Sequence, residues 1–278
     1  ILEVRSLIRE EKWCGEVNFI ERDENLGLAQ SVIRGVSKII SKHGKVIVLE
    51  DDIVVGKYFL NFLNKGLEIY ESEQRVFGIS GYQFSPVKPI KENSYFLPIM
   101  SSLGYGNWLD RWNKISFDDN ELLQIINSRN LAPKLDFGNL SYYQMLKDQV
   151  YGKIDSWAIR FYVSMFLNNG VFLFPKSSLL QNIGFDDSGV NSLSEMQNDY
   201  GQSINLNKKI EVERREVDIN RFILESSKKG TLDFLGRNET GIKKILKKII
   251  PPALLQFARR KIIKKKKSDS QKITIPRY

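Results

Sequence analysis

The sequence predicts an α/β protein in which a mostly parallel sheet is flanked by helices. Helical and strand-like patterns alternate through the first 80 residues, in the order helix, strand, helix, strand, helix, strand. The apolar run Val46–Leu49 lacks polar alternation, which is typical of a strand covered on both faces, as in a parallel sheet. With 278 residues, 42% of them hydrophobic and 27% charged, the chain is long enough for one large core or two smaller units.

The elements of the first 80 residues follow from hydrophobic spacing. Apolar residues three and four positions apart indicate one buried helical face, and short apolar runs indicate strands. The predicted helices span about residues 3–12, 29–40 and 59–70, and the predicted strands span 17–20, 46–49 and 76–80.

After Gly81 the pattern is looser. The stretch SSLGYGNWLDRW (101–112) predicts a glycine-punctuated turn that enters a helix. Further helices are expected at 141–150 and 155–170, a strand at 172–174, and a polar loop of functional character from 175 to 192. The predicted organisation is therefore an α/β domain over residues 1–192, a connector of uncertain structure over 193–240, and a basic tail over 241–278.

The net charge of +9 belongs to the tail rather than to the whole chain. Residues 241–267 hold eleven Lys and Arg residues and no acid, so the rest of the chain has a net charge of −2. A nearly neutral body argues against nucleic-acid binding. No run approaches the roughly 20 apolar residues of a membrane span, and the single cysteine, Cys14, permits no internal disulfide. We expect a cytoplasmic protein in which Cys14 is a small buried thiol.

Three consecutive acids, Glu50, Asp51 and Asp52, follow the strand at 46–49 directly. In an open parallel sheet ligands bind at the carboxyl ends of strands, and three neighbouring carboxylates repel one another unless a cation compensates. Carboxylate oxygens suit Mg²⁺ or Mn²⁺, and such an ion would hold a diphosphate group. The alternative is a solvated loop or a helix cap. A cap explains little, because the next helix is expected to begin near Gly56, four residues on.

Three motifs carry a resemblance to a known family. They are the acidic triplet in register with the ENLGL turn (24–28), DSWAIR (155–160) and LLQNIGFDDSG (179–189). In this order they resemble bacterial nucleotide-diphospho-sugar glycosyltransferases, specifically the group similar to N-acetylglucosaminyltransferase I. The resemblance covers about residues 1–192 and implies a GT-A-like (Rossmann-like) fold. Such a domain normally begins with a strand, whereas this chain begins with a predicted helix and with Ile rather than Met, so we expect the first strand to be missing.

The resemblance implies a metal and nucleotide site at the triplet. It assigns Asp52 to the metal, and Glu50 and Asp51 to positioning of the nucleotide. Asn191 stands where relatives often have a histidine, and it would be a weak metal ligand. The implied cofactor is Mn²⁺ or Mg²⁺.

Further residues are candidates for binding the nucleotide sugar. Arg22 falls where the family places groups near the nucleotide, with a surface arginine as the alternative. Gly81 and Tyr82 are candidates for the sugar pocket, with a plain turn as the alternative. Trp108 and Trp157 are candidates for packing against sugar faces, with core packing as the alternative.

Asp155, the first residue of DSWAIR, resembles the catalytic carboxylate of the family. Transfer with inversion needs a general base that takes the proton of the acceptor hydroxyl. The alternative is a helix N-cap, because Asp directly before a helix accepts its first amide hydrogen bonds.

The basic tail predicts a membrane contact. Apolar residues at helical spacing, Ile242, Ile245, Leu246, Ile249 and Ile250, alternate with lysines, as in cationic helices that lie in a membrane interface. Anionic lipid would attract residues 241–267 and hold the protein at the inner face of the cell membrane. The alternatives are a solvated tail or a helix packed on the body.

The expected activity is therefore transfer of a sugar from a nucleotide-diphosphate donor to a glycan or lipid-linked acceptor. The resemblance favours synthesis of surface polysaccharide or lipopolysaccharide. The alternatives are a nucleotidyltransferase of similar fold and a catalytically inactive sugar- or lipid-binding module. No nucleic-acid partner is expected.

Overall fold

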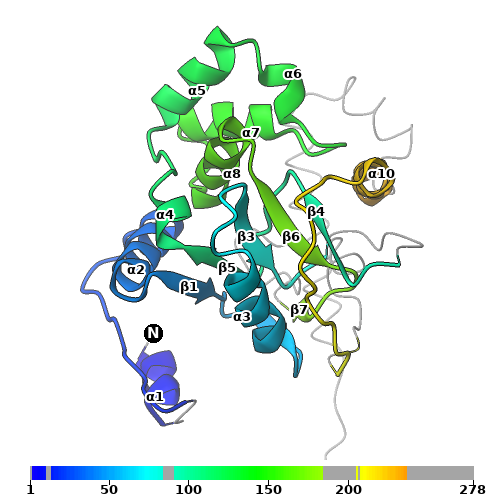
Figure 1. Ribbon diagram of the computed structural model, residues 1–278. Coiled ribbons are helices and arrows are strands. Elements are labelled where there is room, and N and C mark those ends of the chain that lie inside the picture. Colours follow the sequence, from blue (N-terminus) through cyan, green and yellow to red (C-terminus); the bar gives the residue numbers. More distant parts are fainter. Residues whose placement is uncertain (1, 11–13, 84–90, 184–204, 206, 237–278) are drawn as a thin grey trace, which may run out of the picture.

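The computed structural model describes residues 2–10, 14–83, 91–183, 205 and 207–236, and it contains a sheet with helices on both faces (Figure 1). The helices are α1 (Leu2–Glu10), α2 (Leu28–His43), α3 (Phe59–Ile69), α4 (Leu109–Trp112), α5 (Asp119–Ser128), α6 (Ala132–Leu135), α7 (Tyr142–Val150), α8 (Trp157–Leu167) and α10 (Arg221–Gly236). The strands are β1 (Lys45–Val48), β2 (Ile53–Val55), β3 (Val76–Ser80), β4 (Ser94–Leu97), β5 (Tyr105–Trp108), β6 (Val171–Pro175) and β7 (Leu180–Asn182).

The main sheet is mixed rather than mostly parallel. Its five strands lie in the order β1-β5-β3-β6-β4, and only the β3–β6 pair is parallel. The α/β class and the flanking helices are confirmed, but the predicted mostly parallel sheet is wrong. Two strands cause the difference: β5 lies between β1 and β3 and runs opposite to both, and β4 runs opposite to β6. Strands β1, β3 and β6 nevertheless point the same way, so their carboxyl ends share one edge of the sheet.

The two faces of the sheet bury different helices. Helices α2 and α8 cover one face, where Tyr105, Phe161 and Phe172 are fully buried, and α5 and α7 pack on α8. Helix α3 covers the other face, where Phe59 and Trp108 are buried. Val48 of β1 and Tyr105 of β5 lie directly opposite each other, and residues paired in this way point to the same face of a sheet. Both side chains therefore face α2 and α8.

Helices α2 and α8 each end in a short turn that leads into the following strand, β1 or β6. Helix α2 buries Ala29, Val36 and Ile40 and ends at Gly44, whose φ of +76° suits glycine and whose amide donates to the Ile40 carbonyl. The chain then reverses into β1. In the same way α8 is followed by β6 after three residues. The first residues of α2 and α8 therefore lie toward the edge at which β1 and β6 end.

Several predictions about local structure are wrong. Residues 17–20 are not a strand, and the side chains of Phe19 and Ile20 are exposed. Strands β2 and β7 were not predicted, and they pair as a separate two-stranded sheet. Cys14 is exposed rather than buried in a helix. The predicted helices at 29–40, 59–70 and 141–150 and the strand at 76–80 are confirmed within a few residues.

The part of the connector that the structure describes is ordered against the body. Residues 208–219 form neither a helix nor a strand, and Ile210 and Val212 bury their side chains against the α3 face of the sheet. Arg75 donates to the Val217 carbonyl over 3.0 Å. Residues 193–204, 206 and 237–240, like the tail at 241–278, lie outside the described residues. Across the described ranges, no helix is both long and apolar enough to cross a membrane.

Candidate active site

The acidic triplet forms the turn between β1 and β2. The amide of Asn182 donates from Nδ2 to Oδ2 of Asp52 over 3.1 Å, and the backbone N–H of Ile183 donates to the Asp52 carbonyl over 2.9 Å. The strand register places Ile53 opposite Asn182. The third motif of the sequence, LLQNI, therefore lies beside the triplet although 130 residues separate them.

The carboxylates of this turn are crowded. Burial raises the pKa of Glu50 to about 7, with further contributions from the negative charges of Asp52 and Asp51. Oδ1 of Asp52 is buried and accepts no hydrogen bond. Among the described residues no Lys or Arg forms an ion pair with any of the three acids. The turn holds negative charge that this part of the chain does not balance.

A divalent cation fits this corner through one protein ligand rather than a full cage. The described residues contain no group of three Asp, Glu, His or Cys side chains that converge on one point. The buried Oδ1 of Asp52, however, is a free carboxylate oxygen of the kind that Mg²⁺ and Mn²⁺ prefer. Mg²⁺ commonly takes one or two carboxylates and completes its shell with waters and substrate phosphates. The other candidate ligand, Asn191, lies outside the described residues.

Asp155 caps the start of α2, not the start of its own helix. Ser156 is the N-cap of α8, with its Oγ accepting from the Ile159 amide over 3.4 Å. Oδ2 of Asp155 instead accepts from the amide of Ala29 over 3.3 Å. Gly27 makes this approach possible, because its φ is +75° and a Cβ there would lie 3.1 Å from Oδ2 of Asp155. The ENLGL and DSWAIR motifs therefore meet, and the alternative that Asp155 caps α8 is wrong.

Asp155 keeps capacity for further contacts. Its side chain is exposed, and among the described residues only one of its two carboxylate oxygens accepts a hydrogen bond. An exposed carboxylate whose second oxygen is free can accept a proton from a bound hydroxyl group.

The remainder of DSWAIR anchors α8. Arg160 donates from Nε and Nη2 to the two carboxylate oxygens of Asp119 over 2.5 and 2.8 Å. Gln149 accepts from the Ser156 amide over 2.7 Å. These bonds fix the segment that carries Asp155, and sequence reasoning gave Arg160 and Asp119 no role.

Tyr105 connects the acidic turn with the DSWAIR segment. Its ring stacks on Trp157, with centroids 5.6 Å apart, and Trp157 is two residues from Asp155. On the other side, burial raises the pKa of the Tyr105 hydroxyl and the charge of Glu50 raises it further. The Tyr105 ring thus contacts the start of α8, which carries Trp157, while the Tyr105 hydroxyl feels the charge of the acidic turn.

Two comparisons with known proteins found no similar sequence. No protein-family model matches the chain, and a search of curated proteins found no match.

The two tryptophans proposed to bind sugar are core residues. Trp108 and Trp157 are each 2% exposed. The indole N–H of Trp108 donates to the Leu67 carbonyl, and the Arg111 guanidinium lies 4.3 Å from the ring centroid. Neither ring has a surface to offer a sugar, so the binding assignment is corrected to core packing.

Gly81 and Tyr82 are also packed rather than exposed. A Cβ on Gly81 would lie 2.2 Å from a ring carbon of Phe59, so the glycine is needed for close packing. The Gly81 carbonyl accepts from the Leu179 amide over 2.8 Å. Tyr82 is 4% exposed. Both residues are therefore packed beside the end of β3, and their expected place in a sugar pocket stays a prediction.

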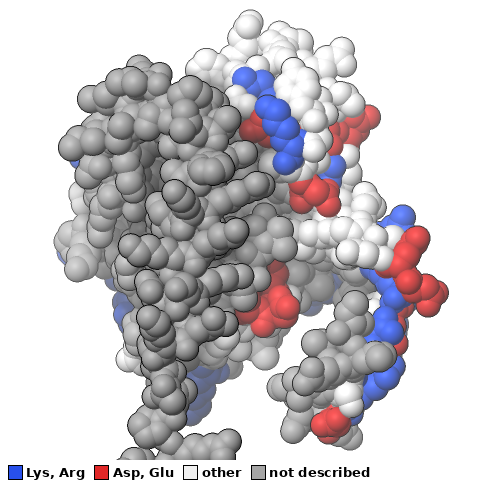
Figure 2. Space-filling model, turned by 180° about the vertical axis from the view of Figure 1, so that it is seen from behind, with Lys and Arg blue, Asp and Glu red and all other residues white. Residues whose placement is uncertain are grey.

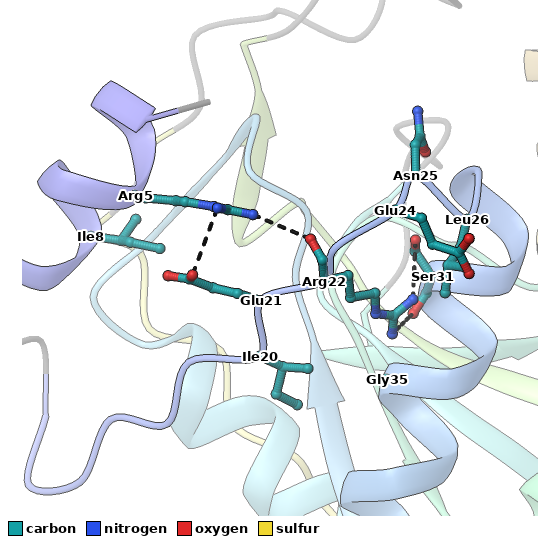
Figure 3. A pocket seen from close by; sticks show the side chains of 10 residues that line it. All are labelled: Arg5, Ile8, Ile20, Glu21, Arg22, Glu24, Asn25, Leu26, Ser31 and Gly35. Atoms are coloured by element: carbon teal, nitrogen blue, oxygen red, sulfur yellow. Dashed lines mark hydrogen bonds and ion pairs between the residues drawn. The ribbon is translucent and has the colours of Figure 1, made fainter.

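Arg22 lines a cavity beside the ENLGL turn (Figure 3). Its guanidinium donates to the side chain and the carbonyl of Ser31 over 3.4 Å, and Arg5 of α1 donates to the Arg22 carbonyl. The cavity has a volume of about 640 Å³ and lies between α1, the segment 20–26 and α2. The described contacts of Arg22 are with these elements and not with the acidic turn.

The opposite face of the molecule shows mixed charge. Figure 2 shows acidic and basic side chains interspersed where residues are described, with no single large basic patch among them on that face.

Proposed function

We propose that this chain is a glycosyltransferase of GT-A-like fold that moves a sugar from a nucleotide-diphosphate donor to a hydroxyl of a glycan or lipid-linked acceptor. One observation carries the proposal. Motifs far apart in the sequence meet in two pairs, the triplet with Asn182 and the ENLGL turn with Asp155. Both pairs lie toward the edge of the sheet where β1, β3 and β6 end, which is where ligands bind in open α/β sheets.

The acidic turn is assigned to the donor. Asp52 would offer its buried, unpaired Oδ1 to a divalent cation. When bound, Mn²⁺ or Mg²⁺ would neutralise charge that develops on the leaving diphosphate. Glu50 and Asp51 would accept hydrogen bonds from hydroxyl groups of the nucleotide and so orient it. This division explains why three acids occur together without a basic residue of the described chain beside them.

Asp155 is assigned the role of general base. The Ala29 amide holds one carboxylate oxygen, and the other is free to accept the proton of the acceptor hydroxyl. The acceptor oxygen then forms its bond to the anomeric carbon from the face opposite the diphosphate, while the bond between sugar and phosphate breaks. The sugar configuration is inverted in such a displacement.

The test is turnover by the Asp155→Asn variant. Purified protein is first screened with UDP-glucose, UDP-galactose, UDP-N-acetylglucosamine and GDP-mannose by thermal shift, with and without Mn²⁺, because a bound donor raises the melting temperature. Release of nucleotide diphosphate is then measured. Asn at 155 can still accept the Ala29 amide bond, so the variant should fold and bind donor but lose turnover by about 100-fold or more.

The matched control is Asp148→Asn, which removes an exposed acid that pairs with Lys153. It should keep wild-type turnover. Equal turnover by wild type and Asp155→Asn would refute the assigned base. Transfer of the nucleotidyl group instead of the sugar would indicate a nucleotidyltransferase, and donor binding without turnover by wild type would indicate a binding module.

We further propose that the protein works in surface polysaccharide or lipopolysaccharide synthesis at the cytoplasmic face of the cell membrane, held there by residues 241–267. The cationic, amphipathic pattern of this tail supports the proposal. Full-length protein should sediment with vesicles that contain phosphatidylserine and not with purely phosphatidylcholine vesicles. Replacing Lys243, Lys244, Lys247 and Lys248 by Gln should abolish sedimentation, and retained binding would refute the role of the tail.

A further inference from the structure

The hydroxyl group of Tyr105 is buried and has no hydrogen-bond partner. The side chain is fully buried in the centre of the sheet. Other buried tyrosines of the core are paired: the Tyr95 hydroxyl accepts from Gln83 over 3.1 Å, and the Tyr162 hydroxyl donates to the Leu135 carbonyl over 2.7 Å. A buried unpaired hydroxyl is unfavourable, so its retention needs an explanation.

Tyr105 lies beside the end of β1, the strand that leads into the acidic turn. It lies opposite Val48 in the β1–β5 register, and Glu50 follows Val48 by two residues. Side chains two residues apart on an extended chain share a face, which brings Glu50 to the side of the sheet that holds Tyr105. The charge of Glu50 acts on the hydroxyl and raises its pKa, after burial. The hydroxyl therefore stays protonated, so toward a carboxylate it can act only as a hydrogen-bond donor.

The ring of Tyr105 is fixed. It stacks on Trp157 and makes an edge contact with Phe161, with centroid distances of 5.6 and 6.1 Å. A rigid ring points its hydroxyl in one direction, whereas the Glu50 side chain has several rotatable bonds. The moving partner of this pair is therefore the glutamate.

We propose that Tyr105 is a positioning residue: its hydroxyl donates a hydrogen bond to the Glu50 carboxylate when the donor is bound, and so holds that carboxylate toward the nucleotide. The inference rests on the proposed function, because it deepens the role given there to Glu50. It explains both the unpaired hydroxyl in the free protein and the placement of a tyrosine beside the acidic turn.

The first test is the thermal stability of Tyr105→Phe without cation or donor. This variant removes a hydroxyl that has no partner, so its melting temperature should equal or exceed that of wild type. The matched control, Tyr95→Phe, removes a paired hydroxyl from the same core and should lower the melting temperature by about 2–4 °C. If Tyr105→Phe melts as far below wild type as Tyr95→Phe, the hydroxyl is already bonded in the free protein and the inference is overturned.

The second test is donor affinity by calorimetry, with the donor found in the thermal-shift screen and with Mn²⁺ present. Loss of a hydrogen bond to a charged group should weaken binding by about tenfold in Tyr105→Phe and leave Tyr95→Phe unchanged. Turnover at saturating donor should change little, because Asp155 is untouched. In a Glu50→Ala background the Tyr105→Phe change should have no further effect, since the hydroxyl acts through Glu50.

The outcomes separate the two proposals. If wild type binds donor and Tyr105→Phe binds it equally well, or if the two substitutions are additive, the positioning role is overturned while the proposed function stands. If wild type binds none of the four sugar nucleotides, the proposed function fails and the positioning role fails with it.

Discussion

Two half-buried acidic regions of this molecule differ in whether a basic side chain pairs with the acids. Asp119 receives both arms of the Arg160 guanidinium, and the two side chains are 17% and 10% exposed. Glu50, Asp51 and Asp52 are crowded together, and no basic side chain of the described residues pairs with them. Asp119 supports the fold, and Arg160 of the same chain supplies the positive charge beside it. Where the acids are left without a basic partner, we propose that the cation comes from outside the chain.

The electrostatics of the two regions differ accordingly. The hydrogen bond to Asp119 raises the pKa of Arg160, so each charge stabilises the other. At the turn, burial and the charges of Asp52 and Asp51 raise the pKa of Glu50 to about 7. A protein tolerates such an unfavourable arrangement mainly at functional sites, where a ligand or ion relieves it.

Removing one partner of the Asp119–Arg160 ion pair should have the largest effect on stability. Asp119→Ala leaves a nearly buried arginine without its carboxylate, which should destabilise the fold by about 3–5 kcal/mol. Calorimetry or thermal unfolding measures the loss. Asp148→Ala removes the partner of Lys153 at the surface, and it should leave the melting temperature unchanged. A melting temperature of Asp119→Ala within about 1 °C of wild type would remove the basis of the comparison.

Replacing Glu50 by a neutral residue should instead stabilise the protein. In the folded state Glu50 keeps its proton up to about pH 7, whereas in the unfolded state it loses the proton near pH 4.5. Between these values the folded state binds more protons, so its stability falls as the pH rises, and the loss is complete above pH 7. The full shift corresponds to about 3 kcal/mol, which partial exposure to water reduces to about 1–2 kcal/mol.

Glu50→Gln, measured with chelator present, should therefore be more stable than wild type at about pH 8 and equal to it at about pH 4. Glu68→Gln, which alters a surface pair with Lys65, is the control and should show no such pH dependence. A stability difference that is the same at both pH values would contradict the raised pKa of Glu50.

Removing the amide that orients Asp52 should have the smallest effect. Asn182→Ala deletes the hydrogen bond to Oδ2 of Asp52 and leaves the backbone pairing of β2 and β7 in place. Outer-shell partners of metal ligands typically change affinity by about 10–100-fold, and we expect about tenfold weaker Mn²⁺ binding by calorimetry. Ser178→Ala, in the same segment, should bind Mn²⁺ as wild type does. Unchanged affinity in Asn182→Ala would show that Asp52 needs no support from β7.

The fold was predictable where periodicity was strong. Helices α2 and α3 and strand β3 follow from apolar spacing alone, because each buries one face or both. Strand β5 was missed because Gly104 and Gly106 indicate a turn, and its direction depends on pairing with β1 and β3 rather than on its own residues. Residues 17–20 have the composition of a strand, but strand formation depends on a pairing that composition does not supply.

The candidate site was predictable in its residue types and not in its contacts. The acids of the turn and Asp155 stand out in the sequence, but the bond from Ala29 to Asp155 spans 126 residues and requires the tertiary fold. The burial of Trp108 and Trp157 depends equally on packing across the sheet. Tyr105 drew no attention in the sequence, since the lack of a hydrogen-bond partner is a property of the folded state alone.

The central claim is that the unbalanced acids at the end of β1 hold a divalent cation. Anomalous diffraction from crystals soaked in Mn²⁺ and UDP tests it most directly. We predict a manganese peak about 2.1 Å from Oδ1 of Asp52, with the other positions of its shell filled by phosphate oxygens and water. A strong anomalous signal elsewhere in the molecule, or none at all beside Asp52, would contradict the account.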